Sequence, residues 1–237
     1  MTLESPVTMI VVAAGNGQRF GGPLPKQYLD LAGRPVLFHT LKSFHVHAEI
    51  CAILPVIAAD GLPLWNHRLK PCLDELPRVK TPVTGGASRQ ESVWRGLASL
   101  DLPADAWIGI HDAARPFPGK NLLRRLLDGR RENNALIAAL PAADTVKRVD
   151  PQSGLILETL DRAKIWLAQT PQLFRYGTIL KLHERARAAR FEGTDDASLA
   201  EWGGLEVRVI PGDVRNIKIT HPEDLELAKR WLQEDLS

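Results

Sequence analysis

Short apolar runs alternate with segments of helical spacing along the first two thirds of the chain. Five runs are typical of buried strands, at residues 9–14, 50–58, 78–83, 107–110 and 135–140. Three segments carry apolar residues three or four positions apart, at residues 36–45, 88–100 and 122–127. This βαβα order predicts an α/β fold with a mostly parallel sheet and helices on both faces.

The alternation breaks after Pro141. Residues 145–149 and 155–160 are typical of two strands joined by the turn at 150–154, which predicts a β-hairpin arm at about 142–165. An arm with so little core of its own must pack on something else. We expect it to pack on a second copy of the chain, which makes the protein a homodimer; the alternative is a hairpin folded back on its own domain.

The C-terminal part returns to the α/β pattern. We expect a helix at 174–189, a short helix that starts at Thr194 and ends at Gly203, and a strand at 205–210. A capping box at Thr220 and Glu223 opens the final helix, which runs to about residue 232. No repeat or linker divides the sequence, so we expect a single domain over residues 1–237, with no room for a fused second one.

A glycine-rich turn follows the first strand, in the stretch VVAAGNGQRFGG at residues 11–22. It lacks the Gly-Lys-Ser/Thr ending of a Walker A loop, and Phe20 stands where a dinucleotide fingerprint needs its third glycine. Arg19 lies in the turn and Lys26 follows it. A flexible turn with two cations suits a nucleoside triphosphate.

Composition and charge exclude several further classes of protein. The formal charge of +2 and the absence of a dense Lys/Arg run argue against a nucleic-acid-binding protein. No apolar run reaches about 18 residues and no signal peptide is visible, so we expect no membrane association. The two cysteines, Cys51 and Cys72, form no metal or disulfide pattern, and we expect a cytoplasmic protein.

Polar residues collect where the predicted strands end, the edge at which open parallel sheets bind ligands. The polar residues are Arg19, His111, Asp112, Arg115 and Lys218, and the glycines Gly15, Gly17, Gly85 and Gly86 lie at the same strand ends. Asp112 has two interpretations from spacing alone. It either binds the Mg²⁺ that accompanies a nucleoside triphosphate, or it has a structural role, in which it caps the segment before Arg115 or pairs with that arginine.

Seven stretches together resemble one family, the 2-C-methyl-D-erythritol 4-phosphate cytidylyltransferases of the non-mevalonate isoprenoid pathway. In order they are AAGNGQRFGGPLPKQYLDLAGRP, GGASRQESV, HDAARP, ADTVKR, LDRAKIWLAQTPQLF, GTDDAS and NIKIT. The resemblance covers residues from about 8 to 233, with Phe20 standing where the family has methionine. It implies a Rossmann-like nucleotidyltransferase fold and a transfer of the cytidylyl group from CTP to methylerythritol 4-phosphate with Mg²⁺, releasing pyrophosphate.

The resemblance also implies roles for individual residues. The catalytic cations would be Arg19, Lys26 and Lys218. The nucleotide would be bound by Ala13, Ala14, Gly15, Gly17, Gly85, Gly86, Ser92 and Asp112, with Asp112 also holding the metal. The sugar phosphate would be bound by Arg115, Thr145, Arg162, Thr170, Thr194 and Asp195. Of these, Thr145 and Arg162 lie in the arm and would reach the site of the neighbouring subunit.

Three other functions are compatible with parts of the pattern. A related cytidylyltransferase acting on ribitol 5-phosphate is disfavoured by Tyr28, Ala114 and the pair Ala197-Ser198. A nucleotide-binding regulator without activity would be expected to lose Lys26, Asp112 or Lys218, and this chain has all of them. A dinucleotide oxidoreductase is disfavoured by Phe20 and by the absence of a suitably placed acid.

Overall fold

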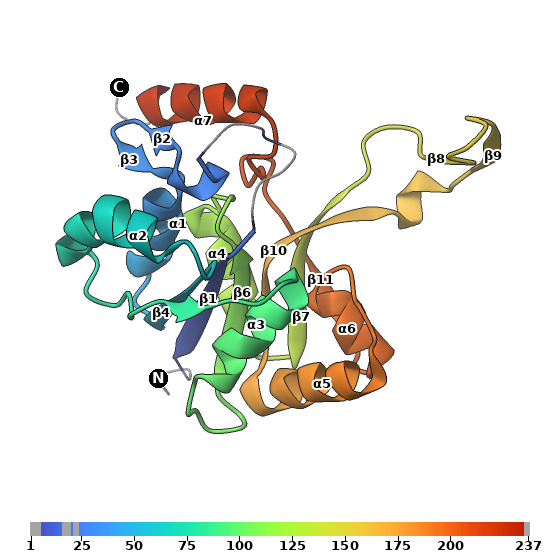
Figure 1. The fold of residues 1–237 in the computed structure, drawn as a ribbon. Coiled ribbons are helices and arrows are strands. Elements are labelled where there is room, and N and C mark those ends of the chain that lie inside the picture. The colour runs from blue at the N-terminus through green and yellow to red at the C-terminus, as the bar shows by residue number, and fades with distance from the viewer. Residues whose placement is uncertain (1–5, 16–19, 21–23, 235–237) are drawn as a thin grey trace.

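A seven-stranded sheet runs through the middle of the molecule in the computed structural model, which describes residues 6–15, 20 and 24–234 (Figure 1). The strand order is β11-β7-β10-β6-β1-β4-β5. Among the described strand pairs of this sheet, β10 alone runs antiparallel to its neighbours, so the predicted mostly parallel sheet is confirmed. The strands are β1 (Val7–Ala13), β4 (Ile50–Ile57), β5 (Val83–Thr84), β6 (Trp107–Asp112), β7 (Ala135–Pro141), β10 (Trp166–Arg175) and β11 (Arg208–Pro211).

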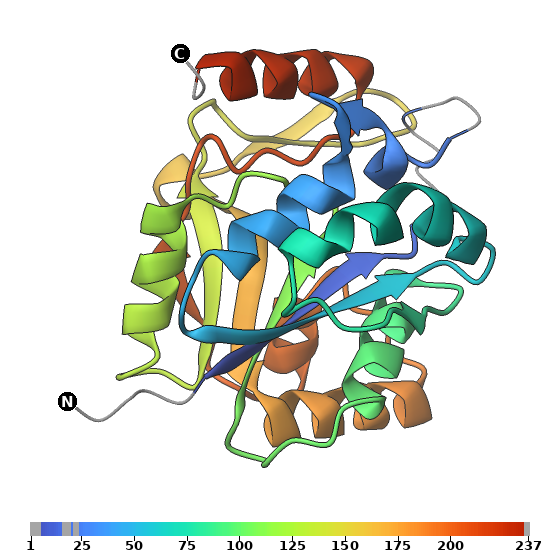
Figure 2. The same cartoon turned by 90° about the vertical axis from the view of Figure 1, so that its left-hand side faces the viewer.

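Helices cover both faces of the sheet (Figure 2). On one face lie α1 (Val36–His45) and α4 (Lys120–Gly129), and on the other α3 (Arg89–Ala98) and α5 (Tyr176–Ala189). A further short helix, α6 (Asp196–Trp202), packs beside α5. The two layers agree with the two faces that the apolar patterns predict.

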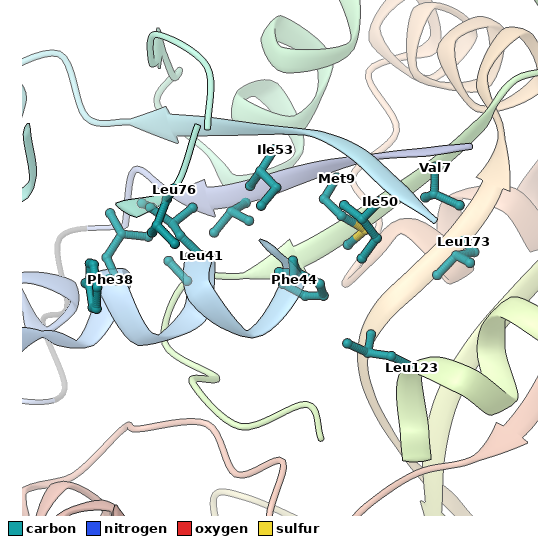
Figure 3. Packing of buried hydrophobic residues seen from close by; sticks show 14 of the residues in the cluster. Val7, Met9, Phe38, Leu41, Phe44, Ile50, Ile53, Leu76, Leu123 and Leu173 are labelled. Atoms are coloured by element: carbon teal, nitrogen blue, oxygen red, sulfur yellow. The ribbon is translucent and has the colours of Figure 1, made fainter. Parts of the chain in front are cut away.

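The inner strand β1, between β6 and β4, shows how the two-residue period of a strand builds both cores. Met9 packs with Leu41 and Phe44 of α1 in one core, whereas Ile10 packs with residues of α3 in the other. Figure 3 shows Met9, Leu41 and Phe44 meeting between strand and helix. Successive strand residues point to opposite faces, so a strand buried on both sides is apolar throughout. Each buried side chain of this size contributes roughly 1.5–3 kcal/mol.

A small third core lies beside the sheet. The hairpin of β2 (Asp30–Leu31) and β3 (Arg34–Pro35) turns through two residues with positive φ, Ala32 at 52° and Gly33 at 79°. Turns of this kind match the twist of paired strands. Leu31 is covered by α7 (Pro222–Glu234) through Leu225 and Ala228, which anchors the C-terminal helix next to the segment that contains Lys26.

The arm predicted at 142–165 is present and extends away from the sheet (Figure 1). Its strands β8 (Lys147–Val149) and β9 (Ile156–Thr159) form a separate two-stranded sheet, followed by the turn η4 (Arg162–Lys164). Leu155, Ile156 and Leu157 of the arm are each more than 60% exposed. Within one copy of the chain these apolar side chains have no core to join.

Two predicted elements are wrong in extent. The expected helix at 174–189 begins two residues late, because Phe174 and Arg175 complete β10, where Phe174 is buried between neighbouring strands. The expected strand at 78–83 is reduced to β5 and one isolated bridge at Val79. Pro82 has no backbone N–H to donate, so a continuous ladder cannot form there.

The ends of several elements also differ from the pattern. Asp195, and not Thr194, caps α6, and the last strand begins at Arg208 rather than at 205. The Asp224 carboxylate accepts hydrogen bonds from the backbone N–H groups of Thr220 and His221. At the start of α7, Asp224 therefore takes the part in the capping box that the sequence predicts for Glu223.

Residues 62–75 form short helical segments for which the apolar pattern gave no prediction. They are α2 (Leu62–Leu64), η2 (Trp65–Leu69) and η3 (Lys70–Glu75), preceded in the chain by η1 (Lys26–Tyr28). Trp65 and Leu69 are buried against the α1 side of the sheet. None of the described helices combines the length and hydropathy needed to cross a membrane.

Candidate active site

A cavity of about 970 Å³ opens beyond the carboxyl ends of β1, β4, β5 and β6. This is the edge of an α/β sheet at which ligands bind. Its walls combine the backbone of small residues with six cationic or acidic side chains from distant segments. The lining residues are Val12, Ala13, Ala14, Gly15, Lys26, Gln27, Ala58, Ala59, Asp60, Gly85, Gly86, Ala87, Ser88, Arg89, Ser92, Arg95, Asp112, Ala113, Ala114 and Lys218.

One wall is formed by the end of β1 and by η1. The buried Gln27 amide donates to the carbonyl oxygens of Ala13 at 2.7 Å and of Gly15 at 3.2 Å. These bonds fix the start of the glycine-rich turn against η1, which places Lys26 at the cavity wall. Gly17 and Arg19 lie outside the described residues.

The opposite wall is the loop from Gly85 to Ser88, which is held by side chains of α3. Ser92 Oγ accepts from the Gly86 N–H at 3.0 Å, and Glu91 accepts from the Ala87 N–H at 2.8 Å. Ser88 caps the helix by accepting from the Glu91 N–H, as the sequence predicts. A Cβ at Gly85 would come within 2.6 Å of the Ala14 Cβ, so the two walls approach closely only because residue 85 is glycine.

Asp112 lies at the floor of the cavity among three cations. Its Oδ2 is 2.7 Å from Lys218 Nζ and 3.9 Å from Arg115 Nε, and its Oδ1 is 3.1 Å from Arg89 Nε. Burial would raise the pKa of Asp112, but the charges of Arg89 and Lys218 outweigh burial and hold the pKa well below the ordinary range. Asp112 is therefore ionised. Its pairing with Arg115 is the looser of these contacts.

Lys218 reaches the cavity because the segment before it is tied to β6 and β10. Asn216 is fully buried and donates to the Thr170 carbonyl at 2.8 Å, while Arg115 donates to the Asn216 carbonyl at 2.7 Å. Gln169 donates to the Asp213 carbonyl at 2.9 Å. Residues far apart in sequence thus place one ammonium group beside Asp112.

His111 and Thr170 support Asp112 from inside the sheet. Since the Arg115 carbonyl can only accept, His111 Nε2 donates to it at 2.9 Å, and the Thr170 hydroxyl donates to Nδ1 at 3.0 Å. The same hydroxyl accepts the Asp112 N–H at 3.1 Å. Burial lowers the pKa of His111 to about 4, which agrees with the neutral ring that these bonds require.

The cavity brings together nine of the residues expected at the site. They are Ala13, Ala14, Gly15, Lys26, Gly85, Gly86, Ser92, Asp112 and Lys218. Six expected sugar-phosphate residues are not part of its lining: Arg115, Thr145, Arg162, Thr170, Thr194 and Asp195.

Those six residues lie in three places. Arg115 and Thr170 stand directly behind Asp112, and both are largely or fully buried. Thr194 is exposed, and Asp195 beside it caps α6 and accepts from Gln172 at 2.7 Å. Thr145 and Arg162 are exposed on the arm.

Arg89 is one of three charged cavity residues that the sequence pattern did not reveal; the others are Asp60 and Arg95. Arg89 follows the Ser88 cap, and this position on the first turn of α3 aims its side chain at the cavity floor. A basic residue in the first turn of a helix interacts unfavourably with the helix dipole. This unusual position was the feature of the sequence that could have pointed to a special role for Arg89. Two carboxylates, Asp112 and Asp196, compensate for it.

Two carboxylates line the cavity, Asp60 and Asp112, and Asp112 is in direct contact with cations. Within residues 6–15, 20 and 24–234, no three His, Cys, Asp or Glu side chains come together as a metal-binding group. Mg²⁺ often takes one or two protein carboxylates and fills its remaining positions with phosphate oxygens and water. The ionised Asp112, in a cavity lined with glycine backbone and cations, fits a metal that arrives bound to a nucleotide.

Comparisons with known proteins match one family over nearly the whole chain. Residues 7–234 match the family described as IspD, 2-C-methyl-D-erythritol 4-phosphate cytidylyltransferase. A protein of that name from Geobacter metallireducens is 44% identical over 97% of this chain and 99% of its own length. A bifunctional IspD/IspF enzyme from Nitrobacter hamburgensis is also 44% identical, and there the chain spans 54% of the relative's length.

The solved structures agree with the sequence relatives. A 4-diphosphocytidyl-2C-methyl-D-erythritol synthase from Anaerococcus prevotii superposes with a TM-score of 0.83 at 32% identity, covering 97% of this chain and 96% of that one. This similarity confirms the Rossmann-like nucleotidyltransferase fold expected from the sequence. With its matched family, its relatives and its fold in agreement, this chain belongs to the IspD family of 2-C-methyl-D-erythritol 4-phosphate cytidylyltransferases.

Proposed function

We propose that this enzyme transfers the cytidylyl group of CTP to 2-C-methyl-D-erythritol 4-phosphate, giving 4-diphosphocytidyl-2-C-methyl-D-erythritol and pyrophosphate. The observation that carries the proposal is the single cavity in which Lys26, Lys218 and Asp112 face the glycine backbone of two loops. The family to which the chain belongs supports the choice of substrates.

The reaction needs no nucleophile from the protein. An oxygen of the sugar phosphate attacks the α-phosphorus of CTP and forms the new P–O bond. The bond from that phosphorus to the bridging oxygen breaks, and pyrophosphate leaves with the electron pair. The task of the protein is to hold two reactants in line and to stabilise the negative charge that accumulates on the phosphoryl oxygens.

Lys26 and Lys218 are placed to stabilise that charge. Both line the cavity, one from η1 and one from the segment before α7. Lys218 pairs with Asp112 in this structure, and a phosphate oxygen would compete with Asp112 for its ammonium group. We assign Arg19 the same role from the family resemblance, although it lies outside the described residues.

We assign Mg²⁺ to Asp112, whose carboxylate is the acid in direct contact with the cations of the cavity. The metal would neutralise charge on the triphosphate and help to orient it. Ala13, Ala14, Gly15, Gly85, Gly86 and Ser92 would then hold the nucleotide, with Gly17 assigned by resemblance.

The sugar phosphate would lie on the side of Asp112 where Arg115, Thr170, Thr194 and Asp195 stand. We propose that Thr145 and Arg162 complete this pocket from the arm of a partner subunit. The exposed apolar side chains of the arm support a homodimer, because two arms packed on partner subunits would remove Leu155, Ile156 and Leu157 from water. We place the enzyme in the cytoplasm, where its two free cysteines stay reduced.

Phosphorus NMR of the enzyme with CTP, methylerythritol 4-phosphate and Mg²⁺ tests the reaction. We expect pyrophosphate and a new diphosphodiester to appear together, and neither to appear when the sugar phosphate is omitted. Ribitol 5-phosphate serves as the competing substrate. Pyrophosphate released equally well with ribitol 5-phosphate, or without any sugar phosphate, would contradict the proposal.

A further inference from the structure

Arg89 connects two buried carboxylates that come from different ends of the fold. Its Nε lies 3.1 Å from Asp112 Oδ1, at the end of β6, and its Nη1 lies 2.8 Å from Asp196 Oδ2, in the first turn of α6. The guanidinium presents its donors in a rigid planar fork. Fixing one side of the fork therefore fixes the direction of the other.

Asp196 is held firmly enough to serve as that fixed side. It is 1% exposed, and the fully buried His183 of α5 places its Nε2 3.3 Å from Asp196 Oδ1. Burial would raise the pKa of Asp196, but the charge of Arg89 and the contact with His183 outweigh burial and keep the carboxyl ionised. A buried carboxylate is costly without a partner, so its pairing with Arg89 is strongly favoured.

The two oxygens of Asp112 consequently have unequal partners. Oδ1 faces Arg89, which is anchored at its far side, whereas Oδ2 faces Lys218. The Lys218 side chain is 35% exposed and lines the cavity, so it can move to a phosphate oxygen. Arg89 cannot follow it without leaving Asp196 unpaired.

We infer that Asp196 is a positioning residue, which acts through Arg89 to divide the Asp112 carboxylate into a held oxygen, Oδ1, and an exchangeable oxygen, Oδ2. In this structure Oδ2 takes Lys218, and in the nucleotide complex Oδ2 would be available to hold the divalent cation. This inference rests on the proposed function of the cavity. It gives the buried side chains His183 of α5 and Asp196 of α6 a role in metal binding, although neither helix lines the cavity.

The test measures metal binding directly. Mn²⁺ is titrated by electron paramagnetic resonance into the full-length enzyme with CTP and without sugar phosphate, and the affinity of Mn²⁺ for CTP alone is the baseline. Asp196→Asn keeps the size of the side chain and removes its charge. We expect its Mn²⁺ affinity to fall about tenfold, the scale found when a group that orients a metal ligand is lost. Glu201→Gln removes an exposed charge from the same helix and should leave the affinity unchanged.

A double-variant comparison separates positioning from general destabilisation. If Asp196 acts through Arg89, Arg89→Gln and the double variant Arg89→Gln/Asp196→Asn will have the same Mn²⁺ affinity. Arg89→Gln leaves the buried Asp196 carboxylate without its cation, so affinities are compared for folded protein, as judged by circular dichroism. The double variant has no unpaired buried charge at this place and therefore gives the affinity without Arg89 free of that penalty. A further loss in the double variant, or an Asp196→Asn affinity within twofold of the wild type, would overturn the inference.

Failure of the inference differs from failure of the proposed function. An enzyme that binds Mn²⁺ with CTP and makes the expected product, yet is indifferent to Asp196→Asn, contradicts only the positioning role. An enzyme that makes no product in the phosphorus NMR experiment contradicts the function on which the inference rests.

Discussion

Asp112 carries a full negative charge inside the protein because cations from three separate segments surround it. Arg89 and Lys218 contact different oxygens of its carboxylate, and Arg115 stands behind it. Removing one partner of a buried ion pair leaves the other charge uncompensated, which costs several kcal/mol when nothing replaces it. Two cations remain around Asp112 after any one is lost, so variants of Lys218 or Arg115 should fold and report on activity. Loss of Arg89 differs, because it also leaves the buried Asp196 without its cation.

Lys218→Met tests the cation that we expect at the phosphates. Because a fixed donor to a transferring group is worth about 2.7–4 kcal/mol of barrier, we expect kcat to fall about 10²- to 10³-fold. Steady-state pyrophosphate release measures this. Lys229→Met, on α7, is the control and should keep the wild-type rate. A kcat for Lys218→Met within twofold of the wild type would remove Lys218 from the proposed mechanism.

His111 makes the stability of the protein depend on pH. Burial lowers its pKa from 6.5 to about 4 in the folded protein, whereas the unfolded chain keeps the ordinary value. Below pH 6.5 the unfolded chain therefore binds a proton that the folded protein does not. The contribution of His111 is fully present above pH 6.5 and is lost as the pH falls to about 4.

Urea unfolding at several pH values measures this contribution, with nucleotide and divalent cations left out. Between pH 6.5 and 4 we expect the wild type to lose about 3 kcal/mol more unfolding free energy than His111→Gln, which has no group titrating there. The comparison with the variant cancels the other histidines and the carboxylates. Parallel pH dependences for the two proteins would show that His111 titrates normally in the folded state.

At the scale of elements, α3 organises one wall of the cavity. Its Glu91 accepts the Ala87 N–H at 2.8 Å and pairs with Arg95 at 2.6 Å, and Arg95 donates to the Gly85 carbonyl at 2.9 Å. The loop is thus fixed in the absence of ligand. A loop ordered in advance saves the entropy that its ordering would otherwise cost on binding.

Glu91→Ala removes this support without touching the cations of the cavity floor. Since one such hydrogen bond contributes on the order of 1 kcal/mol, we expect the KM for CTP to rise about fivefold with kcat almost unchanged. Asp128→Ala is the matched control, because it breaks another i,i+4 pair, with Arg124 on α4. A fall in kcat with an unchanged KM would mean that Glu91 does not act through binding of the nucleotide.

At the scale of the whole molecule, the arm is the element that the fold of one chain does not explain. It extends from the sheet (Figure 1). Its apolar side chains Leu155, Ile156 and Leu157 are exposed, and so is Arg162 of η4. If Arg162 serves the site of the partner, each site of a dimer takes residues from both chains. Twofold symmetry then gives two such composite sites.

Complementation tests this arrangement. Arg162→Glu and Lys218→Met are each expected to be nearly inactive alone, because every site in either homodimer lacks one residue. Co-expression yields mixed dimers in which one of the two sites has both residues, so we expect about a quarter of the wild-type activity from random pairing. If Arg162 served its own chain, each site of a mixed dimer would still lack a residue, and no activity would return.

Local sequence determined most elements of this fold and the place of the candidate site at the ends of the strands. The helix at 36–45, the strand ending in Asp112 and the Ser88 cap depend on apolar period and short-range hydrogen bonds, which the sequence displays directly. The start of the helix predicted at Phe174 was wrong, because Phe174 belongs to β10. Its burial between two neighbouring strands outweighed the helical pattern of the sequence.

The tertiary structure alone decided that Arg89 and Lys218 meet Asp112. Arg89 lies 23 residues from Asp112 in sequence, and Lys218 lies 106 residues away, yet both contact its carboxylate. Sequence period fixes which face of an element a residue takes, but the meeting of side chains depends on how sheet and helices pack. The ion pair between Arg89 and Asp196 therefore carried no local signal, since its energy arises only when packing removes both charges from water.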